Sequence, residues 1–309
     1  MRPGSSASLK RLCPVNEVGL KSLFLKLAFL YARIYGFLSY HRKKERREEI
    51  AGKLAFFLGG QWNPGRRQKA VLHIFELRGA RKIQRYVIPW MDAGFIREFV
   101  EVDGLDHVDR VLRSRRGIVL MTAHFGNPHM GFNALRAMGY DLAVIKGGLP
   151  REFKRRRFRY IDGIQNTIFV GDPSHAQQYK ERILETLRSG KIITHYGDAK
   201  EGRLKEKVLF FGREMAFPTG MIHLAHQSDA AVIPFIHLYR RGRITLIFKE
   251  PIDRGWKDGE EEYRRIVSEF AKTLETYILR YPEQYLGIYG PTVLSEYFRV
   301  HGEAQSGRV

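Results

Sequence analysis

Short apolar runs alternate with helical stretches between residues 117 and 239, and this alternation restricts the possible folds more than any other feature of the sequence. The runs are β-branched and bounded by glycine, proline or polar turns, as buried strands are, and they read GIVLMTA, YDLAVIK, NTIFVG, KIITHYG and AAVIPFIHLY. Between them, residues 130–138, 175–188 and 219–227 have helical spacing. The pattern predicts an α/β fold with a mixed, mostly parallel sheet flanked by helices.

The remainder of the chain fits around this sheet. A turn at residues 240–242 predicts a hairpin into RITLIFKEPI, which would add an antiparallel edge strand. An amphipathic helix is expected at 259–280, ended by Pro282. We therefore expect one main domain at 47–297, a disordered tail at 1–14 and a second tail at 298–309.

The segment 18–40 is the most hydrophobic part of the sequence and is long enough to span a bilayer, which takes about 20 residues. One helical face would carry Leu20, Leu23, Phe24, Leu27, Tyr31, Ile34 and Leu38, with Ser22, Lys26 and Arg33 in a narrow stripe opposite. A Lys or Arg at the bilayer centre costs about 3 kcal/mol, so a helix lying in the headgroup layer is favoured over a crossing one. The first helix of a soluble domain is the alternative.

The sequence is strongly basic, with a net charge of +20 and an isoelectric point near 10.1. The cluster HRKKERR at 41–47 would meet anionic headgroups, so 15–46 is interpreted as an amphipathic membrane-associating helix with a basic segment. No helix-turn-helix, zinc-finger or aromatic RNA-binding signature accompanies the charge, which disfavours nucleic acid as the partner. The single cysteine, Cys13, excludes a disulfide framework and a cysteine-based zinc site.

The sequence MTAHFGNPH places His124 directly after a predicted buried strand and before a helix. Loops at the carboxyl ends of strands in α/β sheets converge on a crevice, so an imidazole there can accept a proton from a bound hydroxyl. Gly126 would allow close backbone approach, and the amides that begin the next helix could stabilise an oxyanion. A structural histidine is the alternative that spacing alone leaves open.

GIVLMTAHFGN resembles the first sequence block of the lipid A biosynthesis acyltransferases, within the lysophospholipid acyltransferase superfamily. The later blocks of that family follow in order: KIITHYGDAKEG, VLFFGREMAFPTG, LAHQSDAAVIPF and YPEQYLGIY. Together they cover about residues 113–289. The resemblance implies transfer of a fatty acyl chain from an acyl thioester to a lipid-linked hydroxyl, with His124 as general base, no metal and no covalent acyl-enzyme.

The sequence departs from the family pattern at His129, where the fifth residue after the catalytic histidine is acidic in the family. An imidazole cannot supply the negative charge that would steady a protonated His124. Asp198 and Glu201, in the second block, are the candidates to replace it, with Asp198 placed in the catalytic set. Ordinary turn acids are the alternative for both.

The resemblance also suggests substrate-binding residues. They are Gly126 and Asn127 beside His124, Glu201 in the second block, Arg156 and Arg159 for acceptor phosphate, and Phe211, Gly212, Pro218 and Gly220 in the third block. Arginine suits bidentate phosphate pairing, and a helix that begins near Gly220 offers free amides. A solvated basic helix and a plain hairpin with a capped helix are the alternatives for these last two groups.

The acyltransferase implied here would use acyl carrier protein or acyl-coenzyme A as donor, with no other cofactor. Its acceptor would be a membrane glycolipid or a lysophospholipid. It would act as a monomer at the cytoplasmic face of a bacterial inner membrane. Because His129 replaces the acidic residue, a catalytically silent relative that binds membrane lipids is the second hypothesis.

Overall fold

The computed structural model describes residues 15–58, 62–147, 167–170, 172–240, 242–257, 259–288, 290 and 292–306. Its helices are α1 Val15–Arg42, α2 Lys44–Leu58, α3 Pro64–Val87, α4 Ala93–Phe99, α5 Leu105–Arg113, α6 Pro128–Ala137, α8 Ala176–Arg188, α9 Gly220–Gln227, α10 Glu260–Arg280 and α11 Val293–Ser306. Its strands are β1 Val100–Asp103, β2 Ile118–Thr122, β3 Leu142–Lys146, β4 Thr167–Phe169, β5 Ile192–Tyr196, β6 Lys205–Phe210, β7 Arg213–Pro218, β8 Ala231–Arg240 and β9 Arg243–Phe248. Short 3₁₀ turns include η2 Ile88–Trp90, η4 Pro173–His175, η5 Pro282–Gln284 and η6 Leu286–Ile288.

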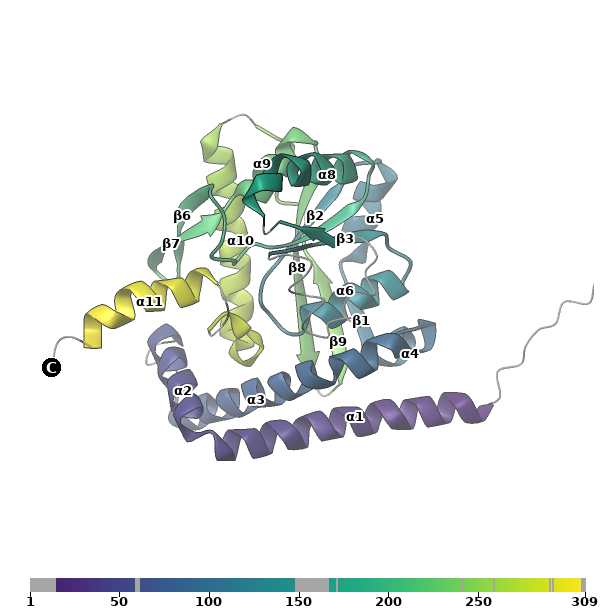
Figure 1. Ribbon diagram of the computed structural model, residues 1–309, viewed down its shortest axis with the longest axis vertical. Helices are drawn as coiled ribbons and strands as arrows, with labels where there is room; N and C mark the ends of the chain where they lie inside the picture. The colour runs from purple at the N-terminus through teal and green to yellow at the C-terminus, as the bar shows by residue number, and fades with distance from the viewer. Residues whose placement is uncertain are drawn as a thin grey trace, which may run out of the picture.

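Seven strands form one sheet in the order β1-β9-β8-β2-β5-β3-β4 (Figure 1). The five strands from β8 to β4 run parallel, β9 is antiparallel to β8, and β1 is parallel to β9. The predicted mixed, mostly parallel sheet is confirmed. The prediction that β9 forms the edge is wrong, because β1 pairs outside it. β1 reads VEVD, too short and too polar to give an apolar strand signal.

The central strand β2 is buried on both faces, as its unbroken apolar run predicts. Ile118 and Leu120 pack with side chains of α4, α5 and α6, whereas Val119 and Met121 pack with side chains of α8, α9 and α10. Two helical layers therefore cover the faces of the sheet. In such sheets ligands bind at the loops that follow the carboxyl ends of the parallel strands.

The helices α1 and α3 lie along one another on one side of the sheet domain (Figure 1), and two glycines bring their backbones together. A Cβ atom at Gly79 would lie 2.1 Å from the carbonyl oxygen of Ala32, and one at Gly36 would lie 2.5 Å from the Cα of Glu76. α1 buries Phe29 and Ala32 in the same core as α4 to α6. The first helix therefore contributes side chains to the core of the fold.

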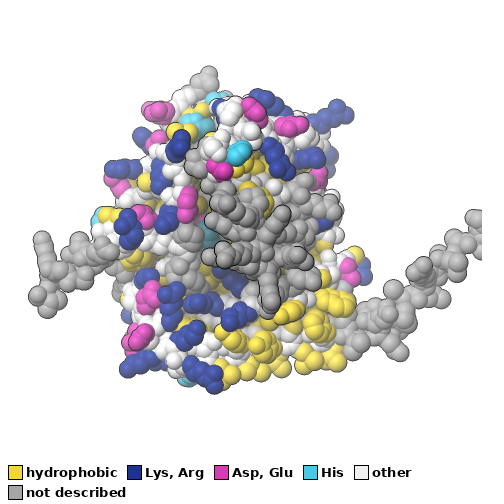
Figure 2. All heavy atoms as spheres, viewed as in Figure 1, with side chains coloured by type: hydrophobic (Ala, Val, Ile, Leu, Met, Phe, Trp, Pro, Cys, Tyr) yellow, Lys and Arg dark blue, Asp and Glu magenta, His cyan; other side chains and the backbone are white. Residues whose placement is uncertain are grey.

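The outer side of α1 is apolar and exposed. Figure 2 shows hydrophobic side chains gathered where α1 lies, with Lys and Arg side chains beside them. Eight large apolar side chains there are between 42% and 58% exposed: Leu23, Phe24, Leu27, Leu30, Tyr31, Ile34, Phe37 and Leu38. Trp90 extends the patch, its ring centroid lying 5.9 Å from that of Phe24. Within the described chain, 22–42 is the one helical stretch whose length and composition would allow it to cross a membrane.

The polar stripe of α1 contacts the rest of the domain. The Ser22 hydroxyl donates to Glu98 at 2.9 Å, Lys26 lies 3.5 Å from the same carboxylate, and Arg33 lies 4.0 Å from Glu76. These contacts join the flank of α1 to α3 and α4, while its apolar outer side faces away from the domain.

Two further segments complete the fold. The strands β6 and β7 form a separate antiparallel hairpin that packs against α10. Residues 298–306, which the sequence assigns to a tail, instead continue α11, because Val293 and Leu294 anchor that helix in the core. The tail expected at 1–14 lies outside the described residues.

Candidate active site

His124 and Asp198 meet at the carboxyl ends of two neighbouring parallel strands. The register pairs Thr122 with Tyr196 at the last position of β2 and β5. His124 and Asp198 each follow two residues later, so the sheet itself brings the two side chains to the same place. This is the edge at which open α/β sheets bind ligands.

The Asp198 carboxylate holds the His124 side chain by the ring and by the backbone. Nδ1 of His124 lies 2.9 Å from Oδ1 of Asp198, and the backbone N–H of His124 donates to both carboxylate oxygens at 3.2 and 3.1 Å. The Asp198 side chain is fully buried, whereas that of His124 is 20% exposed. The imidazole is therefore fixed on one side by a buried acid and remains accessible on another.

Backbone hydrogen bonds hold the turn that carries His124. The Leu286 N–H donates to the His124 carbonyl at 2.7 Å, and the Gly126 N–H donates to the Gln284 carbonyl at 2.7 Å. The Val293 N–H donates to the Asp198 carbonyl at 2.9 Å. The carboxyl-terminal block of the sequence thus fastens both members of the pair.

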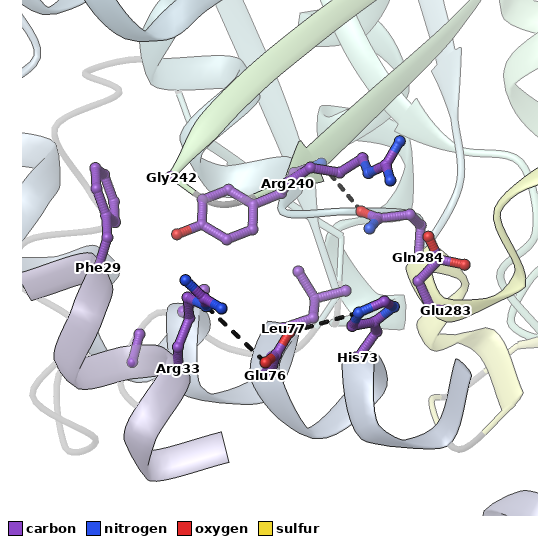
Figure 3. A pocket seen from close by; sticks show the side chains of 12 residues that line it. Phe29, Arg33, His73, Glu76, Leu77, Arg240, Gly242, Glu283 and Gln284 are labelled. Atoms are coloured by element: carbon purple, nitrogen blue, oxygen red, sulfur yellow. Dashed lines mark hydrogen bonds and ion pairs between the residues drawn. The ribbon is translucent and has the colours of Figure 1, made fainter. Parts of the chain in front are cut away.

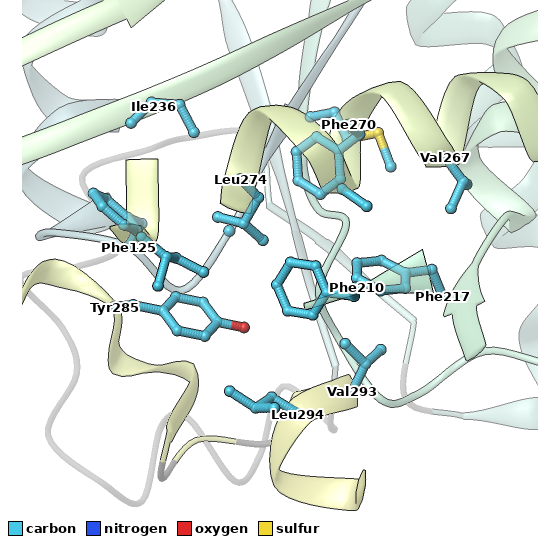
Figure 4. Close-up of a cluster of buried hydrophobic side chains, with 14 of the residues drawn as sticks. Phe125, Phe210, Phe217, Ile236, Val267, Phe270, Leu274, Tyr285, Val293 and Leu294 are labelled. Atoms are coloured by element: carbon cyan, nitrogen blue, oxygen red, sulfur yellow. The ribbon is translucent and has the colours of Figure 1, made fainter. Parts of the chain in front are cut away.

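Aromatic side chains pack behind this turn. Figure 4 shows Phe125 and Tyr285 facing Phe210 and Phe217 of the β6–β7 hairpin, and all four are fully buried. Burial and the nearby Asp198 carboxylate raise the pKa of Tyr285 well above its ordinary value. The phenol therefore stays neutral beside the carboxylate, and the hairpin packs against the turn that carries His124.

The ring of Tyr196 stacks on the ring of His124, with centroids 4.5 Å apart and planes inclined by 25°. Burial raises the pKa of Tyr196. A neutral aromatic ring on one side and a carboxylate on another leave His124 few orientations.

Gly126 and Asn127 follow His124 in the same turn. Gly126 has a φ of +59°, and a Cβ there would lie 2.1 Å from the carbonyl oxygen of His237, so packing against β8 requires the glycine. Its N–H is already bonded to Gln284 and is not free for an oxyanion. The Asn127 side chain is 2% exposed, and neither its oxygen nor its nitrogen has a hydrogen-bond partner among the described residues. Asn127 keeps its candidacy as a substrate contact.

His129 lies in the first turn of α6 and is kept neutral. Burial lowers its pKa to about 3, with Arg81, Lys146, His237 and His124 adding to the effect. The charge of His124 is a minor cause of this shift beside burial and the Arg81 charge. The position that is acidic in the family pattern is occupied here by an uncharged ring close to two cations.

The third-block residues lie in the hairpin and the start of α9. Phe211 and Gly212 form the turn of the β6–β7 hairpin, with φ values of +50° and +70°. The Phe211 N–H donates to the Glu275 carboxylate of α10. Pro218 ends β7 and Gly220 begins α9. Glu201 is exposed. None of these five residues has a hydrogen bond or ring contact with His124 or Asp198 in the described part of the chain.

Arg156 and Arg159 lie outside the described residues. In the described ranges, no group of three or more His, Cys, Asp or Glu side chains is arranged to hold a metal ion.

The structure also brings in residues that the sequence patterns do not single out. His237, on β8, is 1% exposed, and its Nε2 lies 3.4 Å from the Thr122 hydroxyl of β2. Burial lowers the pKa of His237 to about 3, and Arg81 of α3 contributes to that shift. A histidine inside the run VIPFIHLY was the available signal, because a polar side chain in a buried strand requires a partner.

Comparisons with known proteins identify the family to which the chain belongs. Residues 25–289 match the family model described as bacterial lipid A biosynthesis acyltransferase. A lipid A biosynthesis palmitoleoyltransferase of Escherichia coli (strain K12) is 23% identical over 250 residues, 79% of this chain and 78% of that protein. A phosphatidylinositol mannoside acyltransferase of Mycobacterium tuberculosis (strain CDC 1551 / Oshkosh) is 27% identical over 143 residues, 46% of this chain and 45% of that protein.

Among solved structures, the 1-acyl-sn-glycerophosphate acyltransferase PlsC of Thermotoga maritima aligns with a TM-score of 0.39 and 18% identity, covering 84% of this chain and 97% of that one. The family model spans most of the sequence, including the strand that leads to His124 and the terminal block that fastens it. The chain therefore belongs to the bacterial lipid A biosynthesis acyltransferase family and is an acyltransferase.

Proposed function

We propose that this acyltransferase moves a fatty acyl chain from an acyl thioester to a hydroxyl of a membrane glycolipid or a lysophospholipid. His124 is the general base and Asp198 is the residue that orients it. The observation that carries this proposal is the 2.9 Å contact between His124 Nδ1 and the buried Asp198 carboxylate.

The pair supplies the chemistry that such a reaction needs. With the Nδ1 proton directed at Asp198, Nε2 is the ring nitrogen that can accept a proton from the acceptor hydroxyl. The hydroxyl oxygen then attacks the thioester carbonyl, the C–S bond breaks, and the imidazolium returns the proton to the leaving thiolate. A base positioned in this way contributes about 10² to 10⁴ in rate.

Asp198 is our proposed replacement for the acidic residue that the family has at the position of His129. A silent relative was suggested by the loss of the acidic residue at that position, but Asp198 lies at the distance expected of a replacement. That alternative therefore loses its main support.

The substrates are proposed from the family and from the surface. The two relatives named above act, by their names, on lipid A and on a phosphatidylinositol mannoside, which favours a lipid acceptor. A net charge of +20 suits either an acidic acyl carrier protein or the phosphates of acyl-coenzyme A as donor. The exposed apolar side of α1 would dock the enzyme, as a monomer, in the headgroup layer at the cytoplasmic face of the inner membrane.

The test is acyl transfer by the purified protein. Radiolabelled acyl-carrier-protein and acyl-coenzyme A thioesters would be offered with a membrane lipid extract, and labelled lipid measured. We expect transfer by the unmodified chain and a loss of about 10² to 10⁴ in turnover for His124→Ala. His175→Ala, at an exposed histidine in η4, is the matched control and should retain full activity. Undiminished transfer by His124→Ala would refute the mechanism.

A further inference from the structure

A cavity of about 110 Å³ lies where α1, α3, the end of β8 and the η5 turn come together. Phe29, Ala32 and Leu77 form its apolar part, and Gly242 closes one side against the ring of Phe29. Figure 3 shows charged side chains from different elements around this space. Since one water occupies about 30 Å³ in the liquid, the cavity holds a small polar group and not an acyl chain.

The cavity carries both signs of charge. Arg33 of α1 and Glu76 of α3 face each other at 4.0 Å, the outer limit of an ion pair. Arg240 of β8 and Glu283 of η5 line the opposite part. Within the described ranges neither Arg240 nor Glu283 forms an ion pair, with each other or with another side chain. A ligand with one positive and one negative group, separated by a short linker, would match this arrangement.

The position of the cavity adds the second constraint. Phe29 lies on the buried side of α1 and Arg33 on its half-exposed flank, whereas the outer side of the same helix exposes Leu27, Leu30 and Ile34. A lipid bound here could place its headgroup in the cavity and its acyl chains along that apolar side. A second hollow, lined by Lys26, Phe29, Leu30 and Arg33, continues along the flank of α1.

We propose that this cavity binds the headgroup of a zwitterionic membrane phospholipid with a primary ammonium, its phosphate held by Arg33 and Arg240 and its ammonium by Glu283. The site rests on the membrane docking of α1 proposed above. It is separate from the acyl acceptor, which must reach His124. An ammonium with N–H groups can hydrogen-bond a carboxylate, whereas the quaternary ammonium of choline cannot.

The test is sedimentation of the full-length protein with two kinds of vesicle, phosphatidylcholine alone and equal parts of phosphatidylcholine and phosphatidylethanolamine. We expect tighter binding to the ethanolamine-containing vesicles. Arg240→Gln and Glu283→Gln should each lower binding to these vesicles roughly two- to five-fold, the range of a partly exposed ion pair, without changing binding to phosphatidylcholine alone. Arg188→Gln and Glu185→Gln, at exposed positions of α8, are the matched controls and should keep the preference.

Soluble headgroups separate a lipid site from a general phosphate site. Glycerophosphoethanolamine should compete with the vesicles, and sn-glycerol 3-phosphate, which lacks the ammonium, should not. Equal binding to both vesicles, or a preference that survives both Arg240→Gln and Glu283→Gln, would overturn the headgroup site and leave docking intact. Binding to neither vesicle would overturn the headgroup site too, since the ethanolamine headgroup would then provide no affinity. The Leu27→Glu/Ile34→Glu variant tests docking by α1 separately, and the acyl-transfer test of His124 is independent of both results.

Discussion

At the carboxyl edge of the sheet, three polar side chains are buried: the Asp198 carboxylate, the Thr122 hydroxyl and the His237 imidazole. Along α1, by contrast, eight large apolar side chains are about half exposed. The two regions depart from the usual distribution of side chains in opposite directions. Buried polar groups are costly unless they are hydrogen-bonded, and exposed apolar patches favour association with other surfaces. Both departures are easier to explain by function than by stability, the first by proton transfer and the second by contact with lipid.

The largest effect should follow from neutralising the buried acid. Asp198→Asn keeps the shape of the side chain but removes the charge that steadies a protonated His124 and can turn the ring to the wrong tautomer. We expect turnover to fall by about 10² to 10⁴, with little change in vesicle binding. Glu185→Gln, at an exposed acid of α8, is the control and should retain activity. An active Asp198→Asn enzyme would mean that the buried pair is structural.

A second prediction uses acid to probe the same region. The pKa of His237 is lowered to about 3 in the folded state, so protonation favours the unfolded chain, where the pKa is near 6.5. The stability contributed by its burial is present above pH 6.5 and is lost as the pH falls toward 3. At pH 5 the loss is about 2 kcal/mol relative to pH 7.5.

Urea unfolding at those two pH values would measure this loss. Asparagine does not titrate, so the free energy of unfolding of His237→Asn should fall less between pH 7.5 and pH 5 than that of the unmodified chain, by about 2 kcal/mol. This difference does not depend on how stable the variant is at pH 7.5. If the variant and the unmodified chain lost the same free energy of unfolding between the two pH values, His237 would not be a source of acid sensitivity.

The next prediction addresses α1. Leu27→Glu with Ile34→Glu replaces two half-exposed apolar side chains by charges on the outer side of the helix. Each loses about 1 kcal/mol of apolar burial in the headgroup layer, so vesicle binding should weaken roughly 10- to 30-fold. Folding should be unaffected, because neither side chain is in the core.

Leu209→Glu, at a residue that is 66% exposed on β6, is the matched control for this variant. It adds a charge at an exposed apolar position remote from α1 and should bind vesicles like the unmodified chain. If both proteins bound equally well, docking would have to be assigned to another surface.

The smallest effect is expected where the family pattern is restored. His129→Glu places an acid at the position that is acidic in the family, but Nδ1 of His124 is already in contact with the Asp198 carboxylate. Turnover should therefore stay within about three-fold of the unmodified enzyme. A large gain would show that Asp198 does not fill the role assigned to it, and a large loss would show that the neutral ring of His129 has a role of its own.

Much of the fold could be predicted because buried parallel strands have unbroken apolar runs in their sequence. The order of the strands could not, since β1 is four largely polar residues that pair with β9 far along the chain. The length of α11 was missed for a similar reason: its anchoring side chains Val293 and Leu294 lie within a stretch with no strong period.

At the site, the sequence indicated His124 and left two acids as its partner. Only the register of β2 with β5 separates them, because it places Asp198 level with His124 while Glu201 lies three residues further along an exposed turn. The outward face of α1 was likewise visible in the sequence, but its rotation depends on Gly36 and Gly79, whose partners are residues of another helix. Contacts between distant segments, and not local preferences, decided both points.

Gly131 of α6 has a consequence for how this chain can change in evolution. A Cβ there would lie 2.8 Å from the His237 ring, so the helix gives up about 1 kcal/mol of helical preference to accommodate a buried imidazole on β8. Neither position is free to vary alone, because alanine at 131 meets the ring and a smaller residue at 237 leaves a void beneath the glycine. Among relatives the two sites should therefore have been inherited as a unit, with a larger residue at the first tolerated only beside a smaller one at the second.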